Sequence, residues 1–371
     1  MKRVAVLLCL LLIGVLAVSA APKFKVGMVF DVGGRGDNSF NDSAYNGLVT
    51  LAKTYKGWIQ DDPSKVNYGT EIQLKYLEPK AGGQDREILM RALAEDGYQM
   101  IYGVGFLFSD ALTKVAKDFP DIHFGLIDGY IPDLDASSNI TCLSFKENEG
   151  SFLVGAIAAL KARGKPIGFL GGMDIPLIHR FENGFDAGAM YVNKAYRAPG
   201  AIMGQYAGKD PTAFNDPTTG YNISANFYKQ GAEIVFHASG GTGVGLFKAA
   251  QEAKKQSIGV DSDQGLIWAS SKEDATKAQA QYILTSMIKR VDNAVFLSGK
   301  DFIANGGKLD GGYRSFGLKE DGVGFAENQF NKSKLADVRA RVLQIRSDIL
   351  AGKITVPDEN TDMAAYAKSL K

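Results

Sequence analysis

Residues 24–41 read FKVGMVFDVGGRGDNSFN, an apolar strand pattern that runs directly into aspartate, glycine and amide side chains before a helical pattern begins. A second stretch, residues 258–264, reads IGVDSDQ and is again a short apolar run that ends in an aspartate. In an open α/β sheet, ligands are bound where strands end and helices begin. Both stretches place carboxylates and amides at such an edge, and neither sets a nucleophile beside a base. They therefore predict a binding site rather than a reaction centre.

The composition fits a two-domain globular protein with balanced charge. The chain has 371 residues, of which 45% are hydrophobic, and this is enough to fill two cores. It contains 42 Lys and Arg residues and 41 Asp and Glu residues, so its net charge is +1. Because this balance gives no electrostatic footprint for nucleic acid or an anionic membrane, neither is expected as a partner.

The start of the chain has the pattern of a secretory signal peptide, residues 1–20. Lys2 and Arg3 precede an apolar run that is short for a membrane span, and small residues precede the expected cleavage after Ala20. Cys9 lies inside the apolar run and does not follow a small residue at its end, so no lipid anchor is predicted. The expected location is the periplasm.

The remaining cysteine and the histidines predict neither a disulfide nor a metal site. After removal of the signal peptide only Cys142 would remain, and its strand-like surroundings predict a buried, inert thiol. The three histidines, His123, His179 and His237, lack the spacing of metal ligands. No metal or other cofactor is therefore expected.

Short apolar runs alternate with amphipathic helical stretches, which predicts parallel βαβ units and an α/β fold. The expected strands are 25–30, 73–77, 100–104, 123–127, 140–145, 166–170, 201–206, 233–236, 257–260 and 282–284. The expected helices are 43–55, 84–94, 110–117, 150–162, 181–194, 244–255 and 333–350, with a short polar helix at the end of 356–371. The alternation resets near residues 141–150, so two doubly wound lobes are expected.

A glycine-rich run, residues 240–245 (GGTGVG), lies at a strand-to-helix junction, where a phosphate loop would be found. Its spacing does not match GxGxxG, because Lys248 occupies the position of the third glycine, and no Gly-Lys-Ser/Thr follows. A helix N-terminus that offers N–H groups to a neutral polar ligand fits better. The nearby pair Asp261 and Asp263 suits either acid–base chemistry or the binding of sugar hydroxyls.

Three aromatic residues, Phe40, Phe106 and Phe236, fall at the ends of expected strands. A flat ligand held between two lobes would stack on one ring from each lobe, here Phe40 and Phe236. The alternative is that each ring seals the core of its own lobe.

A series of short motifs, in their order and spacing, resembles the basic membrane protein family of substrate-binding proteins, whose best-understood members are purine nucleoside receptors of ABC importers. The motifs are 31–41, 103–106, 155–159, 168–173, 181–185, 240–243, 258–264 and 285–292. The resemblance extends over essentially the whole chain after the signal peptide. It implies a monomeric extracytoplasmic receptor, not an enzyme, that captures a nucleoside and delivers it to an ABC permease.

The resemblance also implies a type I periplasmic-binding-protein fold, with two Rossmann-like lobes joined by a three-crossover hinge. The crossovers are expected near Ser144, Ser286 and Asn305. Lobe 1 would comprise residues 21–143 and 287–304, and lobe 2 residues 144–286 and 305–371. Residues 210–221, which are rich in Asp, Pro, Thr and Gly, depart from the family pattern and are interpreted as a surface insertion at the cleft rim.

The family's ligand-binding residues carry over as a set of expectations. The base would stack between Phe40 and Phe236, and its edge would be bound by Asp31 and Asn41. The ribose hydroxyls would be bound by Asp110, Asp261 and Lys289, with backbone N–H groups from Gly241 to Gly243. Gly105 and Phe106 complete the expected ligand-binding set.

Two other functions stay open on the sequence. The same receptor fold could bind a sugar or a signalling molecule, because sugar sites also use aromatic rings and carboxylates. A secreted nucleoside hydrolase would need a metal-holding aspartate cluster, for which Asp31 with Asp37 is the only candidate pair.

Overall fold

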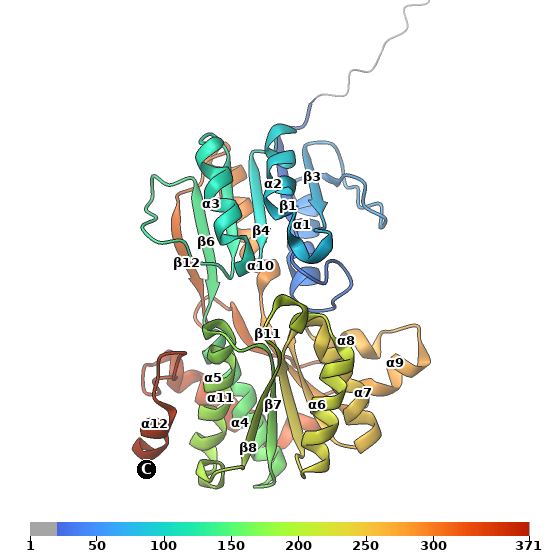
Figure 1. Cartoon of the computed structure of the whole chain (residues 1–371), viewed down its shortest axis with the longest axis vertical. Helices are drawn as coiled ribbons and strands as arrows, with labels where there is room; N and C mark the ends of the chain where they lie inside the picture. Colours follow the sequence, from blue (N-terminus) through green and yellow to red (C-terminus); the bar gives the residue numbers. More distant parts are fainter. Residues whose placement is uncertain (1–20, 371) are drawn as a thin grey trace, which may run out of the picture.

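The computed structural model describes residues 21–370, which form two α/β lobes, one above the other (Figure 1). The expected signal peptide and Cys9 lie outside the described residues. The sheet of lobe 1 contains β1 (Phe24–Val29), β2 (Trp58–Ile59), β3 (Ile72–Leu77), β4 (Met100–Val104), β5 (His123–Ile127), β6 (Ile140–Phe145) and β12 (Gly312–Phe316). Its order is β12-β6-β5-β4-β1-β3-β2, and all of its pairings are parallel.

The sheet of lobe 2 has the order β13-β11-β10-β9-β7-β8. Its strands are β7 (Ile167–Met173), β8 (Ile202–Gly208), β9 (Ile234–Ala238), β10 (Gln256–Asp261), β11 (Ile283–Lys289) and β13 (Val323–Phe325). Only β13, within the described residues, is antiparallel to its neighbour. The doubly wound α/β fold predicted from the sequence is confirmed, and each expected strand is present. Strands β2, β12 and β13 were not predicted, because they are short or polar edge strands.

Helices cover both faces of each sheet. In lobe 1, α1 (Phe40–Thr54) packs beside α10 (Val291–Ala304) on one face, and α2 (Arg86–Glu95) beside α3 (Ser109–Asp118) on the other. In lobe 2, α4 (Glu147–Ala162), α5 (Pro176–Val192) and α11 (Lys332–Leu350) cover one face, and α6 (Pro217–Lys229) with α7 (Val244–Ala253) the other. The short helices α8 (Gln264–Ala269), α9 (Asp274–Gln279) and α12 (Met363–Ser369) lie at the edges. No helix among residues 21–370 is long and apolar enough to span a bilayer.

The chain passes between the lobes three times. The first passage lies between β6 and α4, at Lys146, and the second between β11 and α10, at Arg290. The expected third crossover at Asn305 is wrong, because β12 pairs in parallel register with β6 and thus belongs to lobe 1. The chain returns to lobe 2 only through residues 317–322, before β13. Strand β12 could not be recognised from the sequence, because an edge strand with a polar face carries no continuous apolar run.

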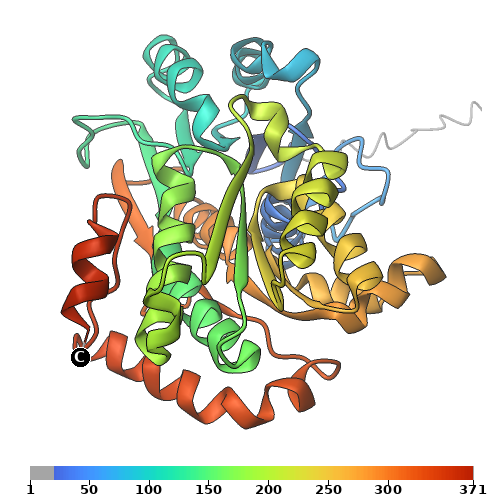
Figure 2. The ribbon, with the colours of Figure 1, turned by 60° about the horizontal axis from the view of Figure 1, so that its bottom comes forward.

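The core of lobe 2 depends on a close approach of α4 and α5. Helix α4 is buried nearly all round, since α5 and α11 pack against it, and α11 runs along the base of the lobe (Figure 2). A Cβ at Gly155 would lie 2.0 Å from the Phe185 carbonyl oxygen, and one at Gly188 would lie 2.0 Å from the Phe152 carbonyl oxygen. Any side chain at these positions would force the helix backbones apart.

Cys142, 2% exposed in β6, is buried as expected.

Gly188→Ala should lower the free energy of unfolding by about 1–3 kcal/mol, because the added methyl group overpacks the α4–α5 contact. Urea denaturation measures the change. Gly324→Ala is the matched control, since nothing lies within 4 Å of a Cβ at that position. Equal effects of the two substitutions would contradict the close helix approach as the cause.

Candidate ligand-binding cleft

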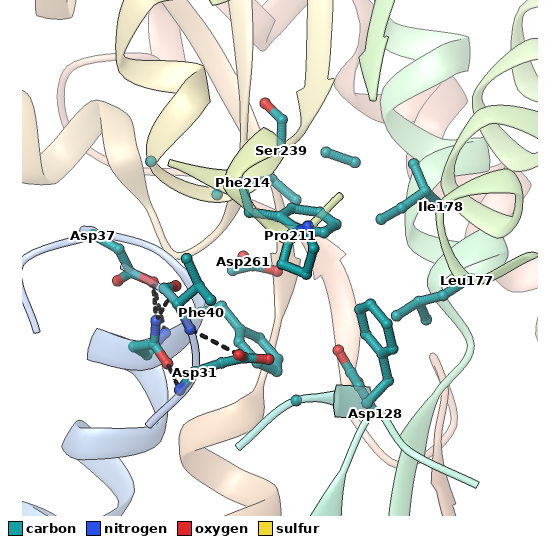
Figure 3. A pocket seen from close by; sticks show the side chains of 18 of the residues that line it. Asp31, Asp37, Phe40, Asp128, Leu177, Ile178, Pro211, Phe214, Ser239 and Asp261 are labelled. Carbon is teal, nitrogen blue, oxygen red and sulfur yellow. Dashed lines mark hydrogen bonds between the residues drawn. The ribbon is translucent and has the colours of Figure 1, made fainter. Parts of the chain in front are cut away.

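The carboxyl ends of the parallel strands of both lobes meet at a cleft of about 710 Å³, its open mouth included. Asp31 follows β1 and Asp128 follows β5 in lobe 1, whereas Asp261 ends β10 and Lys289 ends β11 in lobe 2. Figure 3 shows the acidic side chains of the two lobes facing the same space, with Asp31 and Asp37 opposite Asp261. This is the edge at which α/β sheets bind ligands.

The loop that carries the lobe 1 residues is held together by the carboxylate of Asp37. It accepts hydrogen bonds from the backbone N–H groups of Ser39 (2.9 Å), Asn41 (2.8 Å) and Asp42 (3.1 Å), at the start of α1. Burial raises the pKa of Asp37 to about 6, although these N–H groups oppose the shift. Gly33 and Gly34 have φ of +97° and +55°, so the turn before Asp37 uses a backbone conformation that favours glycine.

Asp31 and Asn41 line the cleft, but both side chains are largely engaged within lobe 1. Asp31 Oδ1 accepts from Arg86 Nη2 at 2.7 Å, while burial raises the pKa of Asp31 against the effect of Arg86. Asn41 Oδ1 accepts from the Asp31 N–H (3.1 Å), and Asn41 Nδ2 donates to Asp37 (3.1 Å). Gly105 is required here, since a Cβ would lie 2.1 Å from Asp31 Oδ2. Asn41 thus positions the loop.

The pair considered as a hydrolase metal site is occupied by these internal contacts. Asp31 binds Arg86, and Asp37 binds backbone N–H groups. Among residues 21–370, no group of three or more His, Cys, Asp or Glu side chains is arranged to hold a metal ion.

A buried ion triad forms the floor of the cleft. Lys289 Nζ lies 2.5 Å from Asp128 Oδ2 and 3.0 Å from Glu147 Oε1, and the Lys289 side chain is 2% exposed. Burial alone would lower the pKa of Lys289, but Asp128, Glu147 and Asp261 outweigh it and raise that pKa above its usual range. Burial raises the pKa of Asp128 to about 6 against the attraction of Lys289. Asp128 Oδ1, which is buried, makes no hydrogen bond within the protein.

Asp261 faces the triad from lobe 2 with a strained backbone, since its φ is +62°. Its Oδ2 accepts a hydrogen bond from Ser39 Oγ of lobe 1 at 2.5 Å. Burial raises the pKa of Asp261 to about 7; Lys289 and Ser39 oppose the shift, and Asp128 and Asp37 add to it. The cleft is therefore rich in hydrogen-bond acceptors, and its lysine is already neutralised.

Aromatic rings line the cleft from both lobes, but the pair differs from the one expected. Phe40 and Phe106 of lobe 1 line it, as do Phe181 and Phe214 of lobe 2. Phe106 and Phe214 meet across the lobes, with ring centroids 6.5 Å apart at 69°. Phe214 closes a 3₁₀ turn, η4 (Pro211–Phe214), within the segment interpreted as a surface insertion.

Phe236 does not line the cleft. Its side chain is fully buried and packs against Phe169 (5.7 Å) and Phe185 (5.3 Å) in the core of lobe 2. Successive residues of a strand point to opposite faces of the sheet, and position 236 of β9 faces the helices rather than the strand end. The expectation that Phe236 stacks on the ligand therefore does not fit its place in the core.

Two further expected residues lie outside the cleft lining. Asp110 is exposed on the first turn of α3, and Gly243 lies beneath the imidazole of His237, where a Cβ would be 1.9 Å from the ring. The carboxylate that lobe 1 does place at the floor is Asp128. The sequence held a signal for it, because Asp128 directly follows an expected strand, as Asp31 does.

Comparisons with known proteins find a matching family model, similar sequences and similar solved structures. Residues 24–360 match the model of the Bmp family, described as "ABC transporter substrate-binding protein PnrA-like". The chain is 37% identical to the CD4+ T-cell-stimulating antigen of Listeria monocytogenes, covering 91% of this chain and 88% of the relative. It is 31% identical to the ABC transporter nucleoside-binding protein BmpA of Lactococcus lactis, covering 90% and 89%. A solved ABC transporter solute-binding protein from Aeropyrum pernix superposes with a TM-score of 0.73 at 28% identity, covering 93% and 96%.

Replacing Asp261 by asparagine should change how stability depends on pH. The pKa of Asp261 in the folded protein, about 7, lies above the ordinary value near 4. The contribution of Asp261 to the free energy of unfolding is therefore fully present below about pH 4 and is lost as pH rises through about 7. Asparagine does not titrate. The melting temperature of Asp261→Asn, relative to wild type, is therefore expected to rise between about pH 4 and pH 8. Asp121→Asn, at an exposed carboxylate, controls for net charge; a pH-independent difference for Asp261→Asn would contradict the raised pKa.

Proposed function

This chain belongs to the Bmp family of PnrA-like ABC transporter substrate-binding proteins, and we propose that its ligand is a neutral purine nucleoside, which it delivers to an ABC permease. The observation that carries the proposal is the cleft lining, which combines phenylalanine rings from both lobes with carboxylates and contains no spare cation. ABC transporter substrate-binding proteins work outside the cytoplasm. The expected signal peptide would direct this chain to the same location.

The rings support a flat base as the part of the ligand between the lobes. Phe40 enters the cleft from lobe 1 and Phe214 from lobe 2, as Figure 3 shows. Stacking of a base on an aromatic side chain contributes about 1–3 kcal/mol and tolerates any base. Phe40 also covers Lys289, whose Nζ lies 5.2 Å from the ring centroid. We therefore assign the second stacking ring to Phe214 in place of Phe236.

The carboxylates support hydroxyl groups as the other part of the ligand. Carboxylate oxygens accept hydrogen bonds, and adjacent sugar hydroxyls supply matching donors. Asp128 has a buried oxygen without a hydrogen bond in the protein, and Asp261 faces it across the cleft. A ribose bound between these two carboxylates would satisfy both.

The charge of the lining argues against a phosphorylated ligand. Its charged residues are Asp31, Asp37, Asp128, Asp261 and Lys289. Because Lys289 is already paired with Asp128 and Glu147, a phosphate would meet uncompensated negative charge. A neutral nucleoside fits this negatively charged lining, and a negatively charged nucleotide does not.

Binding between lobes joined by three crossovers implies a hinged clamp. Ligand would bind one lobe first, and contacts from the second lobe would then favour closure, since a ligand shifts such an equilibrium only through its differential affinity. The closed form is the one that the permease would recognise.

Isothermal titration of the refolded protein tests the ligand class, with guanosine, inosine, adenosine, ribose and guanosine 5′-monophosphate. At least one purine nucleoside should bind saturably and without product formation, and the monophosphate should bind at least about 100-fold more weakly because of like-charge repulsion. Ribose alone should bind weakly, because it leaves the rings unused. Tight binding of ribose, or of the monophosphate, would contradict the nucleoside assignment.

The assignment of the stacking ring is tested by Phe214→Ala. The loss of one stacked ring should weaken nucleoside affinity by roughly 5- to 100-fold, as the same titration would measure. Phe236→Leu serves as the comparison, because it should lower stability through the core of lobe 2 and leave affinity unchanged. The opposite pattern, with affinity lost only on changing Phe236, would restore the sequence-based expectation.

A further inference from the structure

Three hydrogen bonds join the two lobes at the edge of the cleft. Gln264 Nε2 donates to the carbonyl of Asn38 (3.2 Å), Ser262 Oγ donates to the carbonyl of Ser39 (3.3 Å), and Ser39 Oγ donates to Asp261 Oδ2 (2.5 Å). Of these five residues only Asp261 lines the cavity. The contacts of Gln264 and Ser262 with lobe 1 therefore act without touching a ligand in that cavity.

The lobe 1 side of this contact is preformed. Asn38, with φ of +52°, donates its N–H to Asp42 Oδ2 (2.9 Å), and Gly36 donates to Asp42 Oδ1 (3.1 Å). Ser39 donates its N–H to Asp37. The carbonyls of Asn38 and Ser39 are thereby fixed toward lobe 2 by bonds that lie wholly inside lobe 1.

The lobe 2 side is equally well defined. Gln264 Oε1 accepts from the Val260 N–H (2.9 Å) and lies 3.0 Å from His237 Nε2, while the Gln264 N–H donates to Ser286 Oγ (3.1 Å). Burial lowers the pKa of His237 to about 4, which favours the neutral ring. Because Gln264 Oε1 already accepts from the Val260 N–H, the His237 Nε2 that faces this oxygen is assigned as the protonated, donating nitrogen. With its oxygen held by two donors, the amide must present its NH₂ group to Asn38.

We propose that Gln264 and Ser262 form an interlobe latch, a pair of positioning residues that sets the closed population and the dwell time of the bound ligand without contacting it. The proposal rests on the hinged clamp proposed above. Because each half is held by hydrogen bonds within its own lobe, closure would order few additional groups and keep most of the energy of the new hydrogen bonds. The latch bonds form only on closure, so they should favour it equally for every ligand.

The test compares Ser262→Ala and Gln264→Glu with Ser257→Ala. Glutamate keeps an acceptor toward Val260 and places an oxygen against the Asn38 carbonyl. The control removes a buried serine of β10 that donates within lobe 2, to the Tyr282 carbonyl at 2.8 Å. In the ligand-free protein, spin labels at Ile88 and Lys272, both exposed and on different lobes, report the distance between lobes. Both latch variants should shift this distance distribution to longer values, and the control should not.

Dissociation of guanosine and inosine supplies the second readout. The dissociation rate should rise about 2- to 5-fold in Ser262→Ala and about tenfold in Gln264→Glu, by the same factor for both nucleosides. An unchanged distance distribution in both folded variants, or a factor that differs between the nucleosides, would overturn the latch. If Gln264→Glu does not fold, Ser262→Ala decides. If the wild type binds no nucleoside, the nucleoside proposal fails while the distance measurement still decides the latch.

Discussion

The buried ammonium group of Lys289 is the constraint on which the arrangement of the lobes depends. Lys289 ends β11 just before the second crossover, and Glu147 opens α4 just after the first. Asp128 reaches the same point from lobe 1. A charge with 2% exposure is tolerable only with partners of opposite sign, and removing one partner of such a pair is strongly destabilising. The ion triad therefore fixes where the lobes and two crossovers meet.

The same triad determines the electrostatic character of the cleft. Its two carboxylates neutralise the lysine. Asp128, Asp37 and Asp261 lie in a buried space, where desolvation raises the pKa of each carboxyl group. The network also continues away from the cleft, since Arg180 lies 3.6 Å from Glu147 and 2.9 Å from Glu359 of the C-terminal segment. The segment after α11 is thus tied to the hinge as well as to the surface of α5.

Most of the fold could be predicted from the sequence, because buried parallel strands are continuous apolar runs. The strands that were not predicted, β2, β12 and β13, all lie at the edges of the two sheets. Strand β12 has a polar face, and its place in lobe 1 follows from pairing with β6, some 170 residues earlier in the chain. Local periodicity reports burial, but it does not report the partner of an edge strand.

The residues of the candidate site also separate into those that the sequence indicated and those that only the structure revealed. The sequence by itself determined that Asp31 and Asp261 follow strands and that Phe40 lies near a strand end, whereas Lys289 was expected only from the family resemblance. All four residues line the cleft. Only the tertiary structure decided that Asp128 rather than Asp110 lies at the floor, and that Phe214 rather than Phe236 lines the cleft. The physical reason is that position along a strand is local, whereas the direction of a side chain between two lobes depends on the sheet face and on the packing of the opposite lobe.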